Sequence, residues 1–431
     1  MRIKLKFQKK TSAEYIFLFI AVLCVSSFAL LEHMSISIPV FSLVKNPLLY
    51  IGGACILTQL SLLIKTFMKR KYLFLWLALL LFCALLFASV YTNRNPKIGE
   101  SPMRGTVRAV LFLVELYALM IWISERGHTN YFINFLFYYV LLLVAVTDVL
   151  LLTGLITYSD GSHTVYLVGT KFIVSYLHMD LLTLWFLKAD ESYNIRNIPK
   201  LGLVATAILL IVISVRVECM TGVLGCLILF VCFLLIDRPS RKGLSILNAP
   251  VTLFCALVIN LIFPFISKLI VSIPFVNYFV VEVMGKSENL TGRIEIFEIF
   301  SSQMENHWAF GFGFGNENLA ARELFGYANA QNSLLQWILR AGVVNTAMLV
   351  ILMLMIFRYR AKLGEYRRTM PLVILIYVYI FLGSVEITFS MSFIMWVFVL
   401  FVLVSDRRQY ETPHLSENST SENTIPPGAD N

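Results

Sequence analysis

Residues that could carry out chemistry gather in one stretch of the chain, 287–345, whereas most of the remainder is apolar. Arg293 and Arg340 lie in this stretch, and an arginine binds a phosphate or a carboxylate through two parallel hydrogen bonds. Glycine, asparagine and glutamine are also frequent here, and the two amides carry further hydrogen-bond donors. The composition of this stretch predicts a binding site for an anionic substrate.

A surface helix is expected to begin at Arg293. Thr291 is a suitable N-cap, and apolar residues follow at helical spacing, at 294, 297, 300 and 304. This helix would lie on the membrane, with Arg293 in its first turn facing solvent or an anion. A solvated arginine without a further role is the alternative interpretation.

Two features after this helix could offer backbone N–H groups to an anion. The first is a turn with glycines at 311, 313 and 315, which frees the backbone. No strand–helix–strand unit surrounds it, so a dinucleotide site is excluded, and no GxxxxGK[ST] motif for ATP is present. The second is the helix after Asn332 or Ser333, whose N-terminal amides attract anions, although capping alone also explains these residues.

The elements that must position these residues are membrane helices. The chain has 431 residues, of which 58% are hydrophobic and 14% are charged, whereas soluble domains carry about 25% charge. Its net charge of +9 is concentrated in short loops and the N-terminal tail, which is typical of cytoplasmic segments of membrane proteins and not of nucleic-acid binding. All seven cysteines lie in apolar runs without a CxxC motif, so neither disulfides nor a metal site is indicated.

The fold class expected is an all-α integral membrane protein. At about 20 apolar residues per span, about twelve transmembrane helices are predicted, with one large outward-facing loop at about 274–333 that contains the amphipathic helix. The first apolar run lacks a cleavage site, so it is a retained span. The pair 201–215 and 219–236 is short and could form one kinked helix. The expected spans are 15–31, 47–67, 72–91, 105–124, 131–157, 170–188, 201–215, 219–236, 246–273, 334–357, 371–389 and 392–405.

This pattern divides the chain into five parts. Alternating clusters of lysine and arginine place both termini in the cytoplasm and the large loop outside the cytoplasmic membrane. The parts are a basic tail (1–14), an N-terminal bundle of about nine spans (15–273), the extracytoplasmic loop (274–333), three C-terminal spans (334–405) and a disordered polar tail (406–431).

Ionisable residues inside the expected spans are functional candidates, because each costs roughly 2.5–3.5 kcal/mol on insertion scales. Arg108 and Glu115 share a helix face, as do Lys171 and His178. The alternatives are pairing or snorkelling for residues near helix ends, and structural hydrogen bonds for the deeper ones. The set comprises Arg108, Glu115, Asp148, Lys171, His178, Asp180, Arg216, Glu218, Lys268, Arg340 and Glu386.

The order of these motifs resembles the O-antigen polymerase and O-antigen ligase superfamily of bacterial envelopes. In that family about twelve spans are interrupted by one large outer loop, which carries a GR helix, a GxGxGN turn and an HNSxLQ step. The ligase signature has histidine where this chain has Gln331, and a small residue where it has Asn345. Gly169–Phe172 and Ser175–His178 resemble the middle region of Gram-positive capsule polymerases. The matching segments are Thr291–Arg293, Gly311–Asn316, Gln331–Gln336, Gly342 and Arg216, and the resemblance covers roughly 160–400.

The resemblance implies an enzyme that joins oligosaccharides carried on undecaprenyl diphosphate, without a cofactor or a metal. Arginines would stabilise the diphosphate leaving group, and a general base would accept the proton of the attacking hydroxyl. Gln331 cannot accept a proton, so it would orient the acceptor, and the base would be His307, Glu317, Glu295 or none. The catalytic candidates are Arg293, Arg216, Gln331 and His307, and the substrate-binding candidates are Arg340, Asn332, Lys171, His178, Gly313 and Gly315.

Three further interpretations compete with a polymerase: an O-antigen-type ligase that moves a glycan to its final acceptor, a polysaccharide flippase or other transporter, and a non-catalytic assembly subunit. Polar residues should concentrate in the outer loop of an enzyme and along a mid-membrane cavity of a transporter. The partners expected are the lipid-linked oligosaccharide, membrane lipid and other polysaccharide-assembly proteins, but not nucleic acid.

Overall fold

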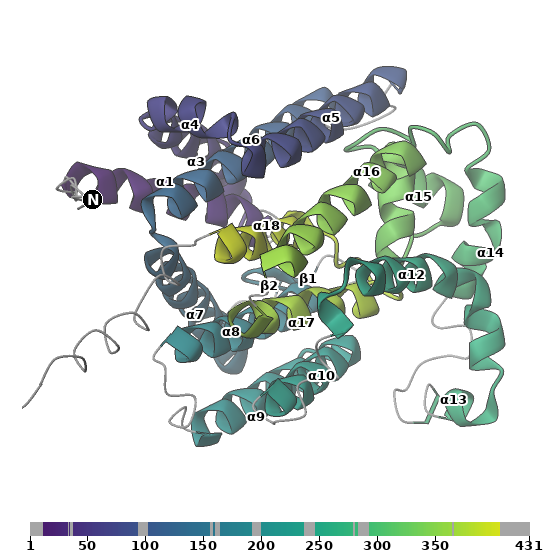
Figure 1. Cartoon of the computed structure of the whole chain (residues 1–431). Helices are drawn as coiled ribbons and strands as arrows, with labels where there is room; N and C mark the ends of the chain where they lie inside the picture. Colours follow the sequence, from purple (N-terminus) through teal and green to yellow (C-terminus); the bar gives the residue numbers. More distant parts are fainter. Residues whose placement is uncertain are drawn as a thin grey trace, which may run out of the picture.

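Helices dominate the computed structural model of this chain (Figure 1). Among the residues that it describes, six helices are long and apolar enough to cross a membrane, or seven if one bent pair counts as a single span. The chain is therefore a helical membrane protein. The structure describes residues 12–32, 34, 38–93, 102–155, 158–159, 164–191, 200–236, 246–278, 281–282, 293–363 and 366–405.

A helix lies at each position where a span was expected. The basic tail up to residue 11, Thr291 with its predicted capping role, and the polar tail after residue 405 lie outside the described residues. The long apolar helices are α1 (Ser12–Leu30), α5 (Arg70–Thr92), α6 (Pro102–Arg126), α7 (Thr129–Thr153), α12 (Pro250–Val271) and α16 (Ser333–Leu363). The others of the bundle are α3 (Pro39–Leu57), α4 (Leu60–Phe67), α8 (Lys171–Glu191), α9 (Lys200–Arg216), α10 (Met220–Ile236), α17 (Tyr366–Leu382) and α18 (Met391–Ser405).

The expected span 47–67 is broken. Helices α3 and α4 meet at an angle of 74°. The hydroxyl of Thr58 donates to the carbonyl of Cys55 over 2.6 Å, and such side-chain bonds compete with the helical ladder. This turn therefore ends α3 one residue before Thr58.

The short helices α9 and α10 lie side by side and are not one kinked helix (Figure 1). Glu218 between them adopts a φ of 56°, in the left-handed region that side chains rarely enter. Gly222 then lets α10 approach α8, because a Cβ at this position would lie 2.4 Å from the hydroxyl of Ser175. The α9–α10 turn is thus a fixed corner beside α8.

The expected span 371–389 is too long at its C-terminal end. Helix α17 ends at Leu382, and residues 383–390 form a loop before α18. Glu386 therefore lies in this loop and not inside a helix. The reason is a set of polar contacts: the hydroxyl of Thr388 donates to the carbonyl of Tyr379, and the N–H of Thr388 donates to the hydroxyl of Ser333.

A small antiparallel sheet connects α7 to α8, which the sequence did not predict. Its strands are β1 (Tyr158–Ser159), β2 (Thr164–Tyr166) and β3 (Gly169–Thr170), in the order β1-β2-β3. Val165 of the central strand β2 lies opposite Tyr158 of β1 and opposite Thr170 of β3. The sheet is an exception to an otherwise helical fold, and it leads directly into the first turn of α8.

The two ends of the helix bundle differ in composition. At the end we call the basic end, Glu125 pairs with Lys69 and with Lys71 at 2.7 Å, and Arg126 pairs with Glu14 at 3.2 Å. Helices α5 and α16 run antiparallel, since Asn345 donates to the carbonyl of Phe82 and the hydroxyl of Ser89 contacts the carbonyl of Arg340. The opposite end, which we call the loop end, holds the segment 293–332 and the loop 383–390.

Candidate functional site

The segment 293–332 packs on the bundle through a small apolar core of its own. It contains α14 (Arg293–Gln303) and α15 (Glu317–Phe325), which lie beside α12 and the first part of α16 (Figure 1). The apolar face expected at 297, 300 and 304 is confirmed, whereas Ile296 and not Ile294 is fully buried. The core comprises Ile296, Phe297, Phe300, Met304, Ala321, Phe325, Ala330, Leu335, Ile338 and Leu339.

Arg293 turns into the protein and not toward solvent. Its guanidinium lies 2.5 Å from Glu386, and its Nε–H donates to the carbonyl of Val385 over 2.8 Å. Both side chains are largely buried, with 12% and 8% of their surfaces exposed. Of the two expected surroundings, solvent and an anion, the structure shows an anionic one, because the loop after α17 offers a carboxylate and a carbonyl to its planar fork.

Tyr176 of a neighbouring helix lies near this ion pair. The hydroxyl of Tyr176, in α8, interacts electrostatically with Glu386, with Arg293 and with Cys219 at the start of α10. Its ring meets that of Tyr379 edge-on, with centroids 5.5 Å apart. The Arg293–Glu386 pair is thus part of a junction between α8, α10, α14 and the 383–390 loop.

Arg216 lies at the loop end but does not pair with Arg293. It is exposed at the end of α9, and its charge acts on Tyr166 of β2. Burial first, and the charge of Glu218 second, raise the pKa of Tyr166, while Arg216 opposes them. Cys219 lies near both Tyr166 and Tyr176, so each of the two arginines acts on a tyrosine near the α9–α10 corner.

Arg340 forms a second ion pair, with Glu317 at 2.7 Å. The other oxygen of Glu317 accepts the N–H of Gly315 over 2.6 Å. The guanidinium also lies over the rings of Phe314 and Trp337, 4.9 and 5.1 Å from their centroids, where cation–π attraction adds to the pairing. Glu317, a candidate general base, is therefore occupied by structural contacts.

The glycine turn closes a break in α16. Gly342 has φ 80° and ψ 172° inside this helix, and a Cβ there would lie 2.1 Å from the carbonyl oxygen of Ala309. The turn supplies the partners that the broken helix lacks: Val343 donates to Trp308 over 2.7 Å, and Leu339 accepts from Phe312 over 2.8 Å. The glycines thus let the backbone of 308–312 bond to the backbone of 339–343, a contact that we call the clasp.

This clasp uses several N–H groups that were expected to hold an anion. The N–H groups of Gly311 and Phe312 donate to carbonyl groups, and that of Gly315 donates to Glu317. Gly313 approaches α5, since a Cβ there would lie 3.2 Å from that of Asn93. The geometry of the turn favours a structural role over an anion cradle.

His307 and Gln331 have local contacts of their own. The His307 ring stacks on Phe312 at 4.0 Å and contacts the carbonyl of Gly311 through Nδ1 at 3.3 Å. Gln331 adopts a left-handed φ of 54°, and its N–H donates to the side chain of Asn329 over 2.9 Å. Neither side chain contacts Arg293 among the hydrogen bonds that the structure describes.

Asn332 caps α16, as expected, and ties it to the 383–390 loop. Its Oδ1 accepts the N–H of Leu335 over 2.9 Å, while its amide donates to the carbonyls of Asn260 and Ser384. Ser333 adds a bond from its hydroxyl to the carbonyl of Glu386 over 3.0 Å. These buried contacts fix the loop that presents Glu386 to Arg293.

The ionisable residues of α8 are paired or lie at its end. Lys171 is the first residue of the helix, and its ammonium lies 5.8 Å from the ring of Phe172. His178 is buried and contacts Asp148 of α7 at 3.2 Å and the carbonyl of Val174 at 2.7 Å. These contacts favour the structural interpretation of both residues.

Other expected features are placed as follows. Arg108 and Glu115 share a face toward α3, where they meet Asn46 and Gly53. Trp337 is buried, with its indole N–H donating to the carbonyl of Phe389 over 2.9 Å.

Comparison of the chain with protein-family models, with curated proteins and with solved structures finds no match in any of the three. Within the residues that the structure describes, no group of three or more His, Cys, Asp and Glu side chains could hold a metal ion. Glu386 was a candidate from the sequence as an ionisable residue inside an expected span, whereas Tyr176 of the junction was not singled out. The available signals were the charge of Glu386 in an apolar region and the place of Tyr176 within the Ser175–His178 segment.

Proposed function

We propose that this chain polymerises oligosaccharide repeat units carried on undecaprenyl diphosphate into a surface polysaccharide. The observation that carries the proposal is the Arg293–Glu386 pair, at 2.5 Å and largely buried at the loop end of the bundle. A guanidinium that already holds a carboxylate in a fixed geometry is suited to hold a phosphate oxygen in its place.

The proposed reaction needs Arg293 to exchange partners. The diphosphate of the donor takes the place of Glu386 on the guanidinium fork. The acceptor hydroxyl attacks the anomeric carbon of the donor sugar, and the bond from that carbon to the diphosphate oxygen breaks. Arg293 stabilises the negative charge that develops on the diphosphate. Arg216, exposed beside the same corner, supplies a second positive charge on the path of the lipid-linked donor.

The proposed topology follows from the two ends of the bundle. Lys69, Lys71 and Arg126 gather at the basic end, and cytoplasmic segments are rich in such residues. We place the basic end in the cytoplasm and the loop end outside, with about twelve crossings of the cytoplasmic membrane. Arg293 then meets a substrate that arrives from the outer leaflet.

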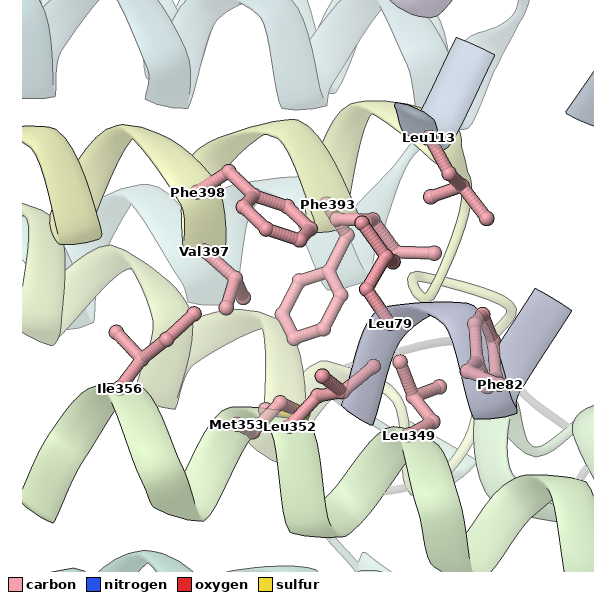
Figure 2. Close-up of a pocket in the computed structure, with 11 residues that line it drawn as sticks. Leu79, Phe82, Leu113, Leu349, Leu352, Met353, Ile356, Phe393, Val397 and Phe398 are labelled. Carbon is pink, nitrogen blue, oxygen red and sulfur yellow. The ribbon is translucent and has the colours of Figure 1, made fainter. Parts of the chain in front are cut away.

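A transporter is less consistent with the interior of the bundle. A cavity of about 10 Å³ between α5, α6, α16 and α18 is lined only by apolar side chains (Figure 2). A sugar or an ion would need polar groups on its path through the membrane. The cavity is lined by Leu79, Phe82, Leu113, Leu349, Leu352, Met353, Ile356, Phe393, Ile394, Val397 and Phe398.

An O-antigen-type ligase remains the second candidate, because it would use the same donor and the same arginine. The observation that favours a polymerase is Gln331, which stands where the ligase signature has a histidine and which cannot accept a proton.

The test is the length of surface polysaccharide in a strain that lacks this protein, complemented with wild type, with Arg293→Ala or with Arg322→Ala. Arg322 is an exposed arginine of α15 and serves as the matched control. We expect wild type and Arg322→Ala to restore a ladder of long chains and Arg293→Ala to leave single repeat units, at equal protein level by immunoblot. Long chains that fail to reach their final acceptor in the deletion strain would identify a ligase. Repeat units trapped inside the cell would identify a flippase.

A further inference from the structure

Tyr176 carries a buried hydroxyl group without a partner. Only 7% of the residue is exposed, and its hydroxyl makes no hydrogen bond within the part of the chain that the structure describes. Burying such a group without a hydrogen bond is costly, and native proteins rarely do so without a reason. A ligand atom that accepts or donates one hydrogen bond would satisfy it.

A small cavity with a mixed lining lies beside this tyrosine: five polar residues and the apolar residues Ala29, Leu30, Ile173 and Leu177 form its wall. Its volume is about 20 Å³, enough for one water molecule or one hydroxyl group. Tyr176 and Asp180 of α8 are buried in its wall. The other polar residues of the wall are half-buried: Glu32 follows α1, Ser390 precedes α18 and Ser392 lies in α18. The polar groups of the wall are thus half-buried at Glu32, Ser390 and Ser392, which we call the rim, and buried at Tyr176 and Asp180.

The cavity and the Arg293–Glu386 pair share two elements. Tyr176 lines the cavity and lies within range of both charges of the pair. The loop that carries Glu386 continues directly into Ser390, whose hydroxyl lies 2.7 Å from that of Ser392. A molecule bound at the cavity would therefore lie next to a molecule bound at Arg293.

We infer that this cavity receives the attacking hydroxyl group of the acceptor sugar, that Tyr176 hydrogen-bonds to it, and that Glu32 accepts its proton. The inference rests on the proposed function, for which it supplies the general base that Gln331 cannot provide. The donor diphosphate and the acceptor hydroxyl then occupy neighbouring subsites of one junction.

Of the two carboxylates at the cavity, Glu32 is the better proton acceptor. Both carboxylates have partners, so the two differ in position: Asp180 is buried and accepts the hydroxyl of Tyr379 over 2.6 Å. Glu32 lies at the half-buried rim, where a proton can pass on to water. As the acceptor oxygen bonds to the anomeric carbon, its proton moves to the Glu32 carboxylate, and the electron pair of the broken bond stays on the diphosphate.

The most informative variant is Tyr176→Phe, because it removes a hydroxyl that forms no hydrogen bond with any described residue. The assay uses the full chain in lipid nanodiscs, with a lipid-diphosphate-linked repeat as donor and the free repeat saccharide as acceptor. We expect the KM for the acceptor to rise about threefold to tenfold, because one hydrogen bond to the acceptor is lost. Binding of the donor lipid should stay unchanged. Tyr377→Phe is the matched control: its hydroxyl donates to the carbonyl of Leu247 over 3.1 Å at the basic end, and its acceptor KM should equal that of wild type.

Glu32 is tested by Glu32→Gln and Glu32→Asp. Loss of a general base lowers kcat about 10²-fold to 10⁴-fold. We therefore expect the kcat of Glu32→Gln to fall by this factor while its KM for the acceptor stays unchanged. The kcat of Glu32→Asp should lie between that of Glu32→Gln and that of wild type. If Tyr176→Phe has the acceptor KM of wild type, or if Glu32→Gln has its kcat, the inference is wrong and the proposed polymerase function still stands. A wild-type protein that never extends the donor overturns the proposed function, and the inference with it.

Discussion

The loop end contains two arginine–carboxylate pairs that differ in what surrounds them. Arg340 and Glu317 lie 2.7 Å apart, and a glycine N–H and two aromatic rings complete their environment. Arg293 and Glu386, at 2.5 Å, lie instead beside a tyrosine hydroxyl without a partner and a partly polar cavity. The surroundings of the first pair favour a structural role, whereas those of the second are consistent with the proposed exchange of its carboxylate for a substrate.

Arg293→Lys should produce the largest effect of any conservative change. Lysine keeps the positive charge but loses the planar fork, and the loss of one group that stabilises a developing anion costs about 10²-fold to 10³-fold in kcat. We expect elongation by Arg293→Lys to fall by this factor while its thermal unfolding in detergent stays close to that of wild type.

Arg340→Lys provides the comparison for this result. If both pairs held the diphosphate, the two substitutions would slow elongation equally. A selective loss of rate in Arg293→Lys separates the substrate-exchanging pair from the structural one.

Gly342→Ala should produce the largest loss of stability. Its φ of 80° is unfavourable for alanine, and its Cβ would lie 2.1 Å from the carbonyl oxygen of Ala309. We expect the free energy of unfolding to fall by more than about 2 kcal/mol, measured by the loss of tryptophan fluorescence signal on heating in detergent.

Gly326→Ala is the matched control for the clasp. It has a similar φ of 73° at the end of α15, but a Cβ there meets nothing within 4 Å. It should cost only about 1–2 kcal/mol, the penalty of the left-handed backbone alone. Equal losses in the two variants would show that the turn is not held against the break in α16.

Much of the fold could be predicted from the sequence, because apolar runs of sufficient length and helical spacing are local signals. The positions of the helices at the expected spans, the buried face of α14 and the cap at Asn332 belong to this part. The partner of Arg293 could not be predicted, since Glu386 lies 93 positions away in the chain and was expected inside a helix. The same is true of the clasp at Gly342, where the contact joins two distant backbones, and of the sheet before α8, whose strands are only two or three residues long.

Glu317→Gln should have a moderate effect on stability and leave the chemistry intact. Glutamine keeps an oxygen that can accept the N–H of Gly315, but it leaves the guanidinium of Arg340 without a charged partner. We expect a loss of about 1–3 kcal/mol in the free energy of unfolding and an elongation rate per folded molecule equal to that of wild type. A loss of rate without a loss of stability would move Glu317 and Arg340 into the substrate site.

Gln331→His should have the smallest effect, although it restores the histidine of the ligase signature. The left-handed φ of 54° at this position is one that histidine tolerates better than most residues, so the fold should be unchanged. Because the proposed proton acceptor is Glu32, the added imidazole should leave the ladder of surface polysaccharide at its wild-type length, as measured by gel electrophoresis. A faster or longer ladder would mean that the acceptor hydroxyl lies at Gln331, and it would transfer the role of the general base from the cavity to the start of α16.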